Sequence, residues 1–150
     1  MVENYKSMRT NVMFSLSTEE NRILAITSSM PSEGKSVTIA NLAVTMAEAD
    51  KKVLLVDADM RKPVQHKNFN LQNRKGLSTI LSRESVFKDC VHRSVIKNLD
   101  ILTSGVIPPN PSELLASKKM REMTEKIKSE YDYILIDTPP ILQMLSLIHI

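Results

Sequence analysis

The chain reads Arg22-Ile23-Leu24-Ala25-Ile26-Thr27-Ser28-Ser29-Met30-Pro31-Ser32-Glu33-Gly34-Lys35-Ser36, after which residues 37–49 are apolar almost all round. A short apolar run bounded by turn-forming residues is typical of a buried strand, and a longer apolar segment is typical of a buried helix. The stretch therefore predicts a strand over residues 22–27, a loop, and a helix over residues 37–49.

The rest of the chain repeats this alternation of strand and helix. Three more apolar runs predict strands at residues 53–56, 99–103 and 133–136. Apolar spacing or a capping residue predicts helices at residues 2–16, at residues 76–81, and from an N-cap at Ser112 to about Ser129. Strands that are apolar on both faces belong to parallel sheets covered by helices, so we predict an α/β fold with a doubly wound, mostly parallel sheet. Ligands of such sheets bind at the carboxyl ends of the strands.

Length and composition limit the classes of protein to consider. With 150 residues, 42% of them hydrophobic, the chain is long enough for one domain with its own core. The net charge of +3 is small and no basic run is interleaved with aromatic residues, so we expect no nucleic-acid partner. The single cysteine, Cys90, is expected to be a buried apolar side chain in a reducing, cytoplasmic setting.

The loop at residues 29–36 lies between a predicted strand and a predicted helix, which is the context of a Walker A motif. Backbone N–H groups of such a loop and of the helix start point into one concavity that favours polyphosphate. We expect Lys35 to contact the β- and γ-phosphates of ATP and the Ser36 hydroxyl to ligate Mg²⁺. The predicted phosphate-binding residues are Ser32, Glu33, Gly34, Lys35, Ser36 and Val37. An ordinary strand-to-helix turn with a surface lysine is the alternative.

Carboxylates follow two of the predicted strands. Asp57 and Asp59 come after residues 53–56, and Asp137 comes after residues 133–136. Ends of parallel strands lie side by side, so these acids are expected next to the phosphate loop, with Ser36, Asp59 and Asp137 as Mg²⁺ ligands. Asp137 has the Walker B placement, and Asp57 or Asp59 is expected to ligate the ion or to accept a proton from an alcohol or phenol. The predicted catalytic residues are Lys35, Asp57 and Asp59. Each acid taken alone is equally consistent with a turn former or a helix cap.

Three motifs together resemble one family. Residues 27–36, 54–63 and 134–140 resemble the Walker A, Walker A′ and Walker B motifs of the bacterial tyrosine kinases of capsule and exopolysaccharide synthesis. Residues 76–78 and 102–115 are similar to that family's intervening segments. The resemblance runs from about Glu3 to Pro140. It implies a P-loop kinase domain at residues 1–140, incomplete at its C-terminus, followed by a tail at residues 141–150 without family resemblance.

This resemblance implies an autophosphorylating, ATP-dependent protein-tyrosine kinase that regulates capsule or exopolysaccharide synthesis. The implied partner is the cytoplasmic tail of a membrane activator, a polysaccharide co-polymerase protein, which would recruit a cytoplasmic kinase to the inner face of the membrane. The family's leading helix carries a Glu-x-x-Arg-x-x-Arg pattern used in assembly. Here Glu3, Lys6 and Arg9 occupy those positions, so a homo-oligomer is expected to form through this helix.

Two other functions remain open at this point. One is a switch ATPase of the chromosome-partition or division-site type, but the signature lysine of those proteins, five positions before the Walker lysine, is Met30 here. The other is a truncated fragment that binds nucleotide without catalysis. It is suggested by the absence of a C-terminal tyrosine cluster, since the only tyrosines are Tyr5, Tyr131 and Tyr133.

Overall fold

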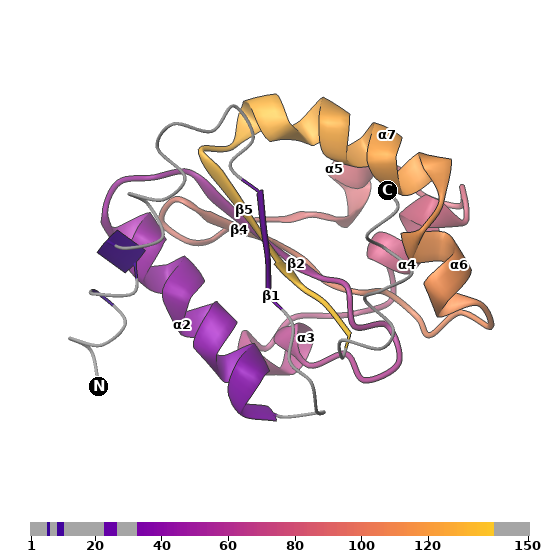
Figure 1. The fold of residues 1–150 in the computed structure, drawn as a ribbon, viewed down its shortest axis with the longest axis horizontal. Coiled ribbons are helices and arrows are strands. Elements are labelled where there is room, and N and C mark those ends of the chain that lie inside the picture. Colours follow the sequence, from indigo (N-terminus) through magenta and orange to yellow (C-terminus); the bar gives the residue numbers. More distant parts are fainter. Residues whose placement is uncertain (1–5, 7–8, 11–22, 27–32, 140–150) are drawn as a thin grey trace.

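The structure, a computed structural model, describes Lys6, Arg9, Thr10, residues 23–26 and residues 33–139. Within these residues five strands and the helices between them alternate along the chain (Figure 1). The strands are β1 (Ile23–Ile26), β2 (Val53–Asp57), β3 (His92–Ile96), β4 (Leu99–Leu102) and β5 (Tyr133–Asp137). The helices are α2 (Glu33–Glu48), α3 (Gln65–Asn68), α4 (Leu77–Leu81), α5 (Phe87–Cys90), α6 (Pro111–Leu115), α7 (Lys118–Ile127) and the 3₁₀ turn η1 (Lys128–Glu130).

All five strands belong to one sheet with the order β1-β5-β2-β4-β3. The pairs β1–β5, β5–β2 and β2–β4 are parallel, and only the edge strand β3 is antiparallel to its neighbour. The register places Ile26 opposite Asp137 and Asp57 opposite Asp137. The carboxyl ends of β1, β5 and β2 therefore lie side by side, and β5 and β2 each end in an aspartate.

Helices cover both faces of the sheet, as Figure 1 shows with α2 on one side and α4 to α7 on the other. Successive residues of β2 alternate between these layers: Val53 and Leu55 pack with α2, whereas Leu54 and Val56 pack with the opposite helices. Because both faces are covered, all five residues of β2 are buried. The prediction of a doubly wound, mostly parallel sheet is confirmed.

One prediction about secondary structure was wrong, and one strand was missed. The helix expected from Ser112 to about Ser129 is two helices, α6 and α7. The chain breaks at Ser117, whose hydroxyl accepts a hydrogen bond from the Met120 N–H and so begins a new helix. The strand β3 was not predicted, because His92–Ile96 is mostly exposed and lacks the apolar pattern of a buried strand.

The predicted leading helix lies almost wholly outside the described residues. Lys6, Arg9 and Thr10 are helical where the structure describes them, and the Thr10 hydroxyl donates to the Lys6 carbonyl oxygen. Arg9 Nη1 donates to the carbonyl oxygen of Thr45, 2.9 Å away, near the end of α2. Among the described residues, no helix combines the length and apolarity that crossing a membrane requires.

A close approach at Gly76 ties α4 to the end of β4. The N–H of Leu77 donates to the carbonyl oxygen of Thr103, and the N–H of Ser78 donates to that of Ser104. Each N···O distance is 2.8 Å. A Cβ at Gly76 would lie under 3.0 Å from backbone atoms of Thr103, Ser104 and Gly105. Only glycine allows the two backbone segments to approach this closely.

We therefore expect Gly76→Ala to lower the free energy of unfolding by about 3 kcal/mol or more, because the clash is with backbone that cannot turn away. Ser82→Ala, at the exposed end of the same helix, is the control and should change stability by less than about 0.5 kcal/mol. Urea unfolding of both variants measures the difference. Equal midpoints would show that the two segments separate without cost.

Candidate phosphate-binding site

The candidate site lies where α2 begins beside the carboxyl ends of β2 and β5. Helix α2 begins at Glu33, so Gly34, Lys35 and Ser36 form its first turn. The N–H groups of a first helical turn have no partner within the helix, and the helix dipole places partial positive charge there. The expected contribution of Ser32 lies outside the described residues, and no side-chain placement is described for Glu33. Val37 is exposed on the second turn.

Asp137 joins the parts of this site. Its side chain is fully buried at the end of β5. Lys35 Nζ lies 2.8 Å from Asp137 Oδ1 and also donates to the Thr138 carbonyl oxygen. The Ser36 hydroxyl donates to Asp137 Oδ2 over 2.9 Å. The structure thus brings together three of the predicted residues, one from the strand end and two from the helix start.

Gln65 belongs to the same cluster, although nothing in the sequence pattern singled it out. Its side-chain amide nitrogen donates to Asp137 Oδ2 and to the Ser36 carbonyl oxygen, each at a distance of 3.0 Å. Its amide oxygen accepts a hydrogen bond from Asn68. Gln65 is fully buried, yet it lies in a four-residue helix that is too short to show a helical period. No sequence signal identified it.

Asp57 lies beside Asp137 in the sheet, but its carboxylate is used by the backbone. Oδ1 accepts from the N–H of Asp59, and Oδ2 accepts from the N–H groups of Val64 and Gln65, at 3.0 to 3.1 Å. Burial raises the pKa of Asp57 to about 7, against the lowering effect of these donors, and the neighbouring Asp137 charge adds to the rise. Asp57 therefore holds the segment that carries Gln65 against the strand ends.

Asp59 is more accessible than Asp57. Its side chain is only partly buried, and Oδ1 accepts one hydrogen bond, from the Lys62 N–H over 3.3 Å. Burial raises its pKa, while the Lys62 N–H and the Lys35 charge lower it. Both Lys35 and Asp137 act on the pKa of Asp59. The carboxylate therefore lies within electrostatic range of the cluster around Asp137.

The oxygen atoms of this site fit a magnesium ion. Mg²⁺ in phosphate sites is held by one or two carboxylates together with hydroxyl and phosphate oxygens. Ser36 Oγ and Asp137 Oδ2 lie 2.9 Å apart, and both belong to that class of ligand. In the described part of the chain no three His, Cys, Asp or Glu residues gather as a metal cluster. An ion here would depend on the Ser36 hydroxyl and on oxygens of a bound phosphate.

Comparisons with known proteins agree with this geometry. The chain matches the AAA domain family over residues 21–150. Tyrosine-protein kinase YwqD of Bacillus subtilis is 49% identical over 140 residues, which make up 93% of this chain and 59% of that protein. The solved VpsO kinase domain is 33% identical with a TM-score of 0.77, and the match covers 93% of this chain and 72% of that one. The chain belongs to the bacterial tyrosine kinase family.

A second kinase domain of this family has almost the same fold. The kinase domain of the Escherichia coli tyrosine kinase ETK superposes with a TM-score of 0.91 at 36% identity, over 97% of this chain and 58% of that one. The present chain thus spans about three fifths of the length of these tyrosine kinase relatives. The septum site-determining protein MinD of Pyrococcus horikoshii is a more distant relative, at 28% identity and a TM-score of 0.71.

The role of Gln65 can be tested through stability. Gln65→Leu keeps the side-chain size but removes the N–H donors to Asp137 and Ser36, which leaves buried acceptors without those partners. We expect the free energy of unfolding to fall by about 1–3 kcal/mol in urea titrations. Lys67→Ala, on the same helix, is the control, because its side chain is exposed and its loss should cost less than about 0.5 kcal/mol. A Gln65→Leu variant as stable as the parent would contradict the bridging role.

Proposed function

We propose that this domain binds ATP with Mg²⁺ and transfers the γ-phosphoryl group to tyrosine, autophosphorylation included. The observation that carries the proposal is the convergence of Lys35 and Ser36 on the buried carboxylate of Asp137. Names of relatives support the reaction type, since YwqD is a tyrosine-protein kinase. The MinD structure was solved with Mg-ADP, which supports the choice of nucleotide and metal.

The first turn of α2 would bind the phosphates. Its N–H groups and the Lys35 ammonium supply positive charge to the β- and γ-phosphates. Lys35 would leave Asp137 Oδ1 to do so, and Gln65 would keep the same carboxylate in place through Oδ2. Ser36, Asp59 and Asp137 would hold the magnesium ion, which neutralises phosphate charge when it is bound.

In the transfer step, the bond between the γ-phosphorus and the β–γ bridging oxygen breaks, and a bond from the tyrosine oxygen to that phosphorus forms. The phenolic proton passes to a carboxylate, and ADP leaves. We assign proton acceptance to Asp59, because its side chain is partly exposed and has a free carboxylate oxygen to offer a substrate. Asp57, also predicted as catalytic, is assigned a positioning role through its three backbone hydrogen bonds.

Regulation of capsule or exopolysaccharide synthesis, a homo-oligomer and a membrane partner are further parts of the proposal. A homo-oligomer would form through the helix that contains Glu3, Lys6 and Arg9, of which Lys6 is exposed. The cytoplasmic tail of a membrane activator would bring the domain, made of residues 1–140, to the inner face of the membrane. CapB of Staphylococcus aureus, a putative tyrosine-protein kinase, is 45% identical over 139 residues, which supports the kinase on which these further parts rest.

Nucleotide binding without transfer is the second candidate function. It is favoured by the extent of the match, since the 140 aligned residues make up 59% of YwqD. Stabilisation by ATP and Mg²⁺ without any phosphotyrosine would support this candidate. Phosphotyrosine formed in the presence of ATP and Mg²⁺ would support the kinase.

Lys35→Met tests the nucleotide site. The parent should melt at a higher temperature with ATP and Mg²⁺, since a ligand at a hundred times its dissociation constant stabilises by about 2.7 kcal/mol. The variant should show no such shift. Its melting temperature without ligand should also fall, because Asp137 loses the ammonium 2.8 Å away. Lys97→Met, at an exposed turn, should keep the full shift. An ATP-dependent shift in Lys35→Met would contradict the assignment.

Asp59→Asn tests proton acceptance. The amide keeps one oxygen for the metal but accepts a proton poorly, so transfer to a tyrosine peptide should fall by about 10²-fold or more. The shift in melting temperature caused by ATP and Mg²⁺ should remain. Asp50→Asn is a matched control, since this aspartate is exposed in a left-handed turn (φ 63°) that asparagine also adopts. Unchanged transfer in Asp59→Asn would exclude it as the base.

A further inference from the structure

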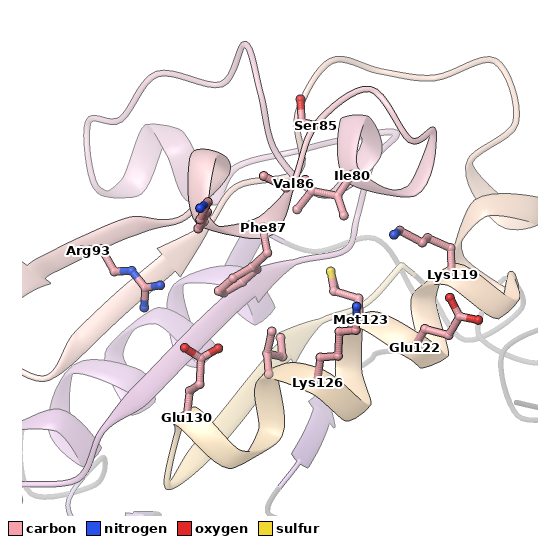
Figure 2. A pocket seen from close by; sticks show the side chains of 12 residues that line it. Ile80, Ser85, Val86, Phe87, Arg93, Lys119, Glu122, Met123, Lys126 and Glu130 are labelled. Atoms are coloured by element: carbon pink, nitrogen blue, oxygen red, sulfur yellow. The ribbon is translucent and has the colours of Figure 1, made fainter.

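A groove of about 370 Å³ lies between α4 and α5 on one side and α7 on the other (Figure 2). Its apolar walls are Ile80, Val86, Phe87, Met123 and Ile127, and we call it the α5–α7 groove. Figure 2 shows Phe87 pointing toward α7 and Met123, on α7, pointing toward the side on which Phe87 lies. The groove shares no lining residue with the phosphate-binding site.

The walls of this groove are anchored in the core. Ile80, Met123 and Ile127 are buried and belong to the apolar cluster between the sheet and α4 to α7. Val86 is different, because 52% of its surface is exposed at the rim. A groove built on core side chains keeps its shape, and a ligand that enters it does not have to order the walls first.

The charges around the groove are mostly positive. Lys88, Arg93, Lys119 and Lys126 line it, against Glu122 and Glu130. Glu122 already has a cation beside it outside the groove, since Lys118 Nζ lies 3.8 Å from its carboxylate. No ion pair is recorded for the three lining lysines within residues 33–139. Their charge is therefore available to a ligand.

Arg93 plays a different part, because it fixes one end of the groove. Its Nη1 lies 3.0 Å from Asp100 Oδ2 and donates to the Tyr131 hydroxyl oxygen, while the Tyr131 hydroxyl donates to the same carboxylate. The guanidinium also lies over the Phe87 ring, 5.7 Å from its centre. These contacts join the β3 edge to the turn before β5 and hold Phe87 at the groove wall.

We propose that the α5–α7 groove binds an acidic peptide segment of a partner protein. One large apolar side chain of the peptide would insert between Phe87 and Met123, and its carboxylates would pair with Lys88, Lys119 and Lys126. A concave slot between helices with an apolar floor and a cationic rim suits a peptide, whereas a bilayer surface is flat. Binding there requires neither nucleotide nor phosphoryl transfer.

The proposal is tested with a fluorescein-labelled peptide of sequence Glu-Asp-Phe-Asp-Glu-Leu-Glu-Asp, followed by fluorescence anisotropy on the chain. We expect saturable binding that weakens as salt screens the charges. Two control peptides separate the contributions. One replaces Phe and Leu by Ser, the other replaces every acid by its amide, and each should bind about tenfold more weakly or worse.

Protein variants locate the binding. Lys119→Glu combined with Lys126→Glu should weaken the acidic peptide by about tenfold or more. The matched control is Lys75→Glu combined with Lys97→Glu, two exposed lysines away from the groove, and it should retain binding. Val86→Asp gives a second test that does not alter α7. Val86 is the exposed N-cap of α5, a position where aspartate is favoured, and its carboxylate should repel the peptide.

Three results would overturn the proposal. The first is no saturable binding of the acidic peptide at concentrations up to about 1 mM, which is the range of weak binding. The second is equal weakening by the groove variants and the matched control, which would reveal attraction by net charge alone. The third is binding of phosphatidylglycerol vesicles, but not of the peptide, with the same dependence on Lys119 and Lys126.

Discussion

The buried carboxylate of Asp137 is the constraint on which the site depends. A charge without exposure to water is tolerated only when it is paired and hydrogen-bonded. Lys35 pairs with Oδ1, and Ser36 and Gln65 both donate to Oδ2. They come from the first turn of α2 and from α3, so satisfying one carboxylate also fixes how both helices sit against β5. The contacts that neutralise Asp137 are thus also contacts that pack the helices onto the sheet.

In this arrangement some contacts of the site are fixed before a ligand binds, and one contact, that of Lys35, can be replaced by a ligand. Asp57 holds the backbone of residues 59, 64 and 65, and Gln65 then holds Asp137. Neither contact involves an atom needed by a phosphate. Lys35, by contrast, is the partner that a polyphosphate would compete for, and the carboxylate it leaves keeps its other donors. A ligand that draws Lys35 away therefore leaves Oδ2 hydrogen-bonded, whereas the buried Oδ1 has no hydrogen-bond donor among the described residues and needs another positive charge in place of the ammonium.

The sequence predicted those features that follow from local pattern. Four of the five strands could be located because each is a short apolar run, and the acids at their ends follow from parallel pairing. The break at Ser117 was missed because its neighbours keep the apolar spacing of one helix across it. Gln65 was missed for another reason. Its side chain contacts Ser36 and Asp137, which are 29 and 72 positions away along the chain, and a local sequence pattern does not reveal such distant contacts.

The two edge strands of the sheet, β1 and β3, differ in how readily another strand could pair with them. At one edge β3 has an irregular register against β4, a left-handed residue at Ser94 (φ 50°), and exposed side chains at Arg93 and Lys97 next to it. Such an edge discourages another strand from pairing. At the other edge, β1 is a regular parallel strand that pairs with β5 over all four of its residues. Within the described residues, an added strand would therefore pair with β1 more readily than with β3, so a second molecule is expected to dock on the sheet at one side only.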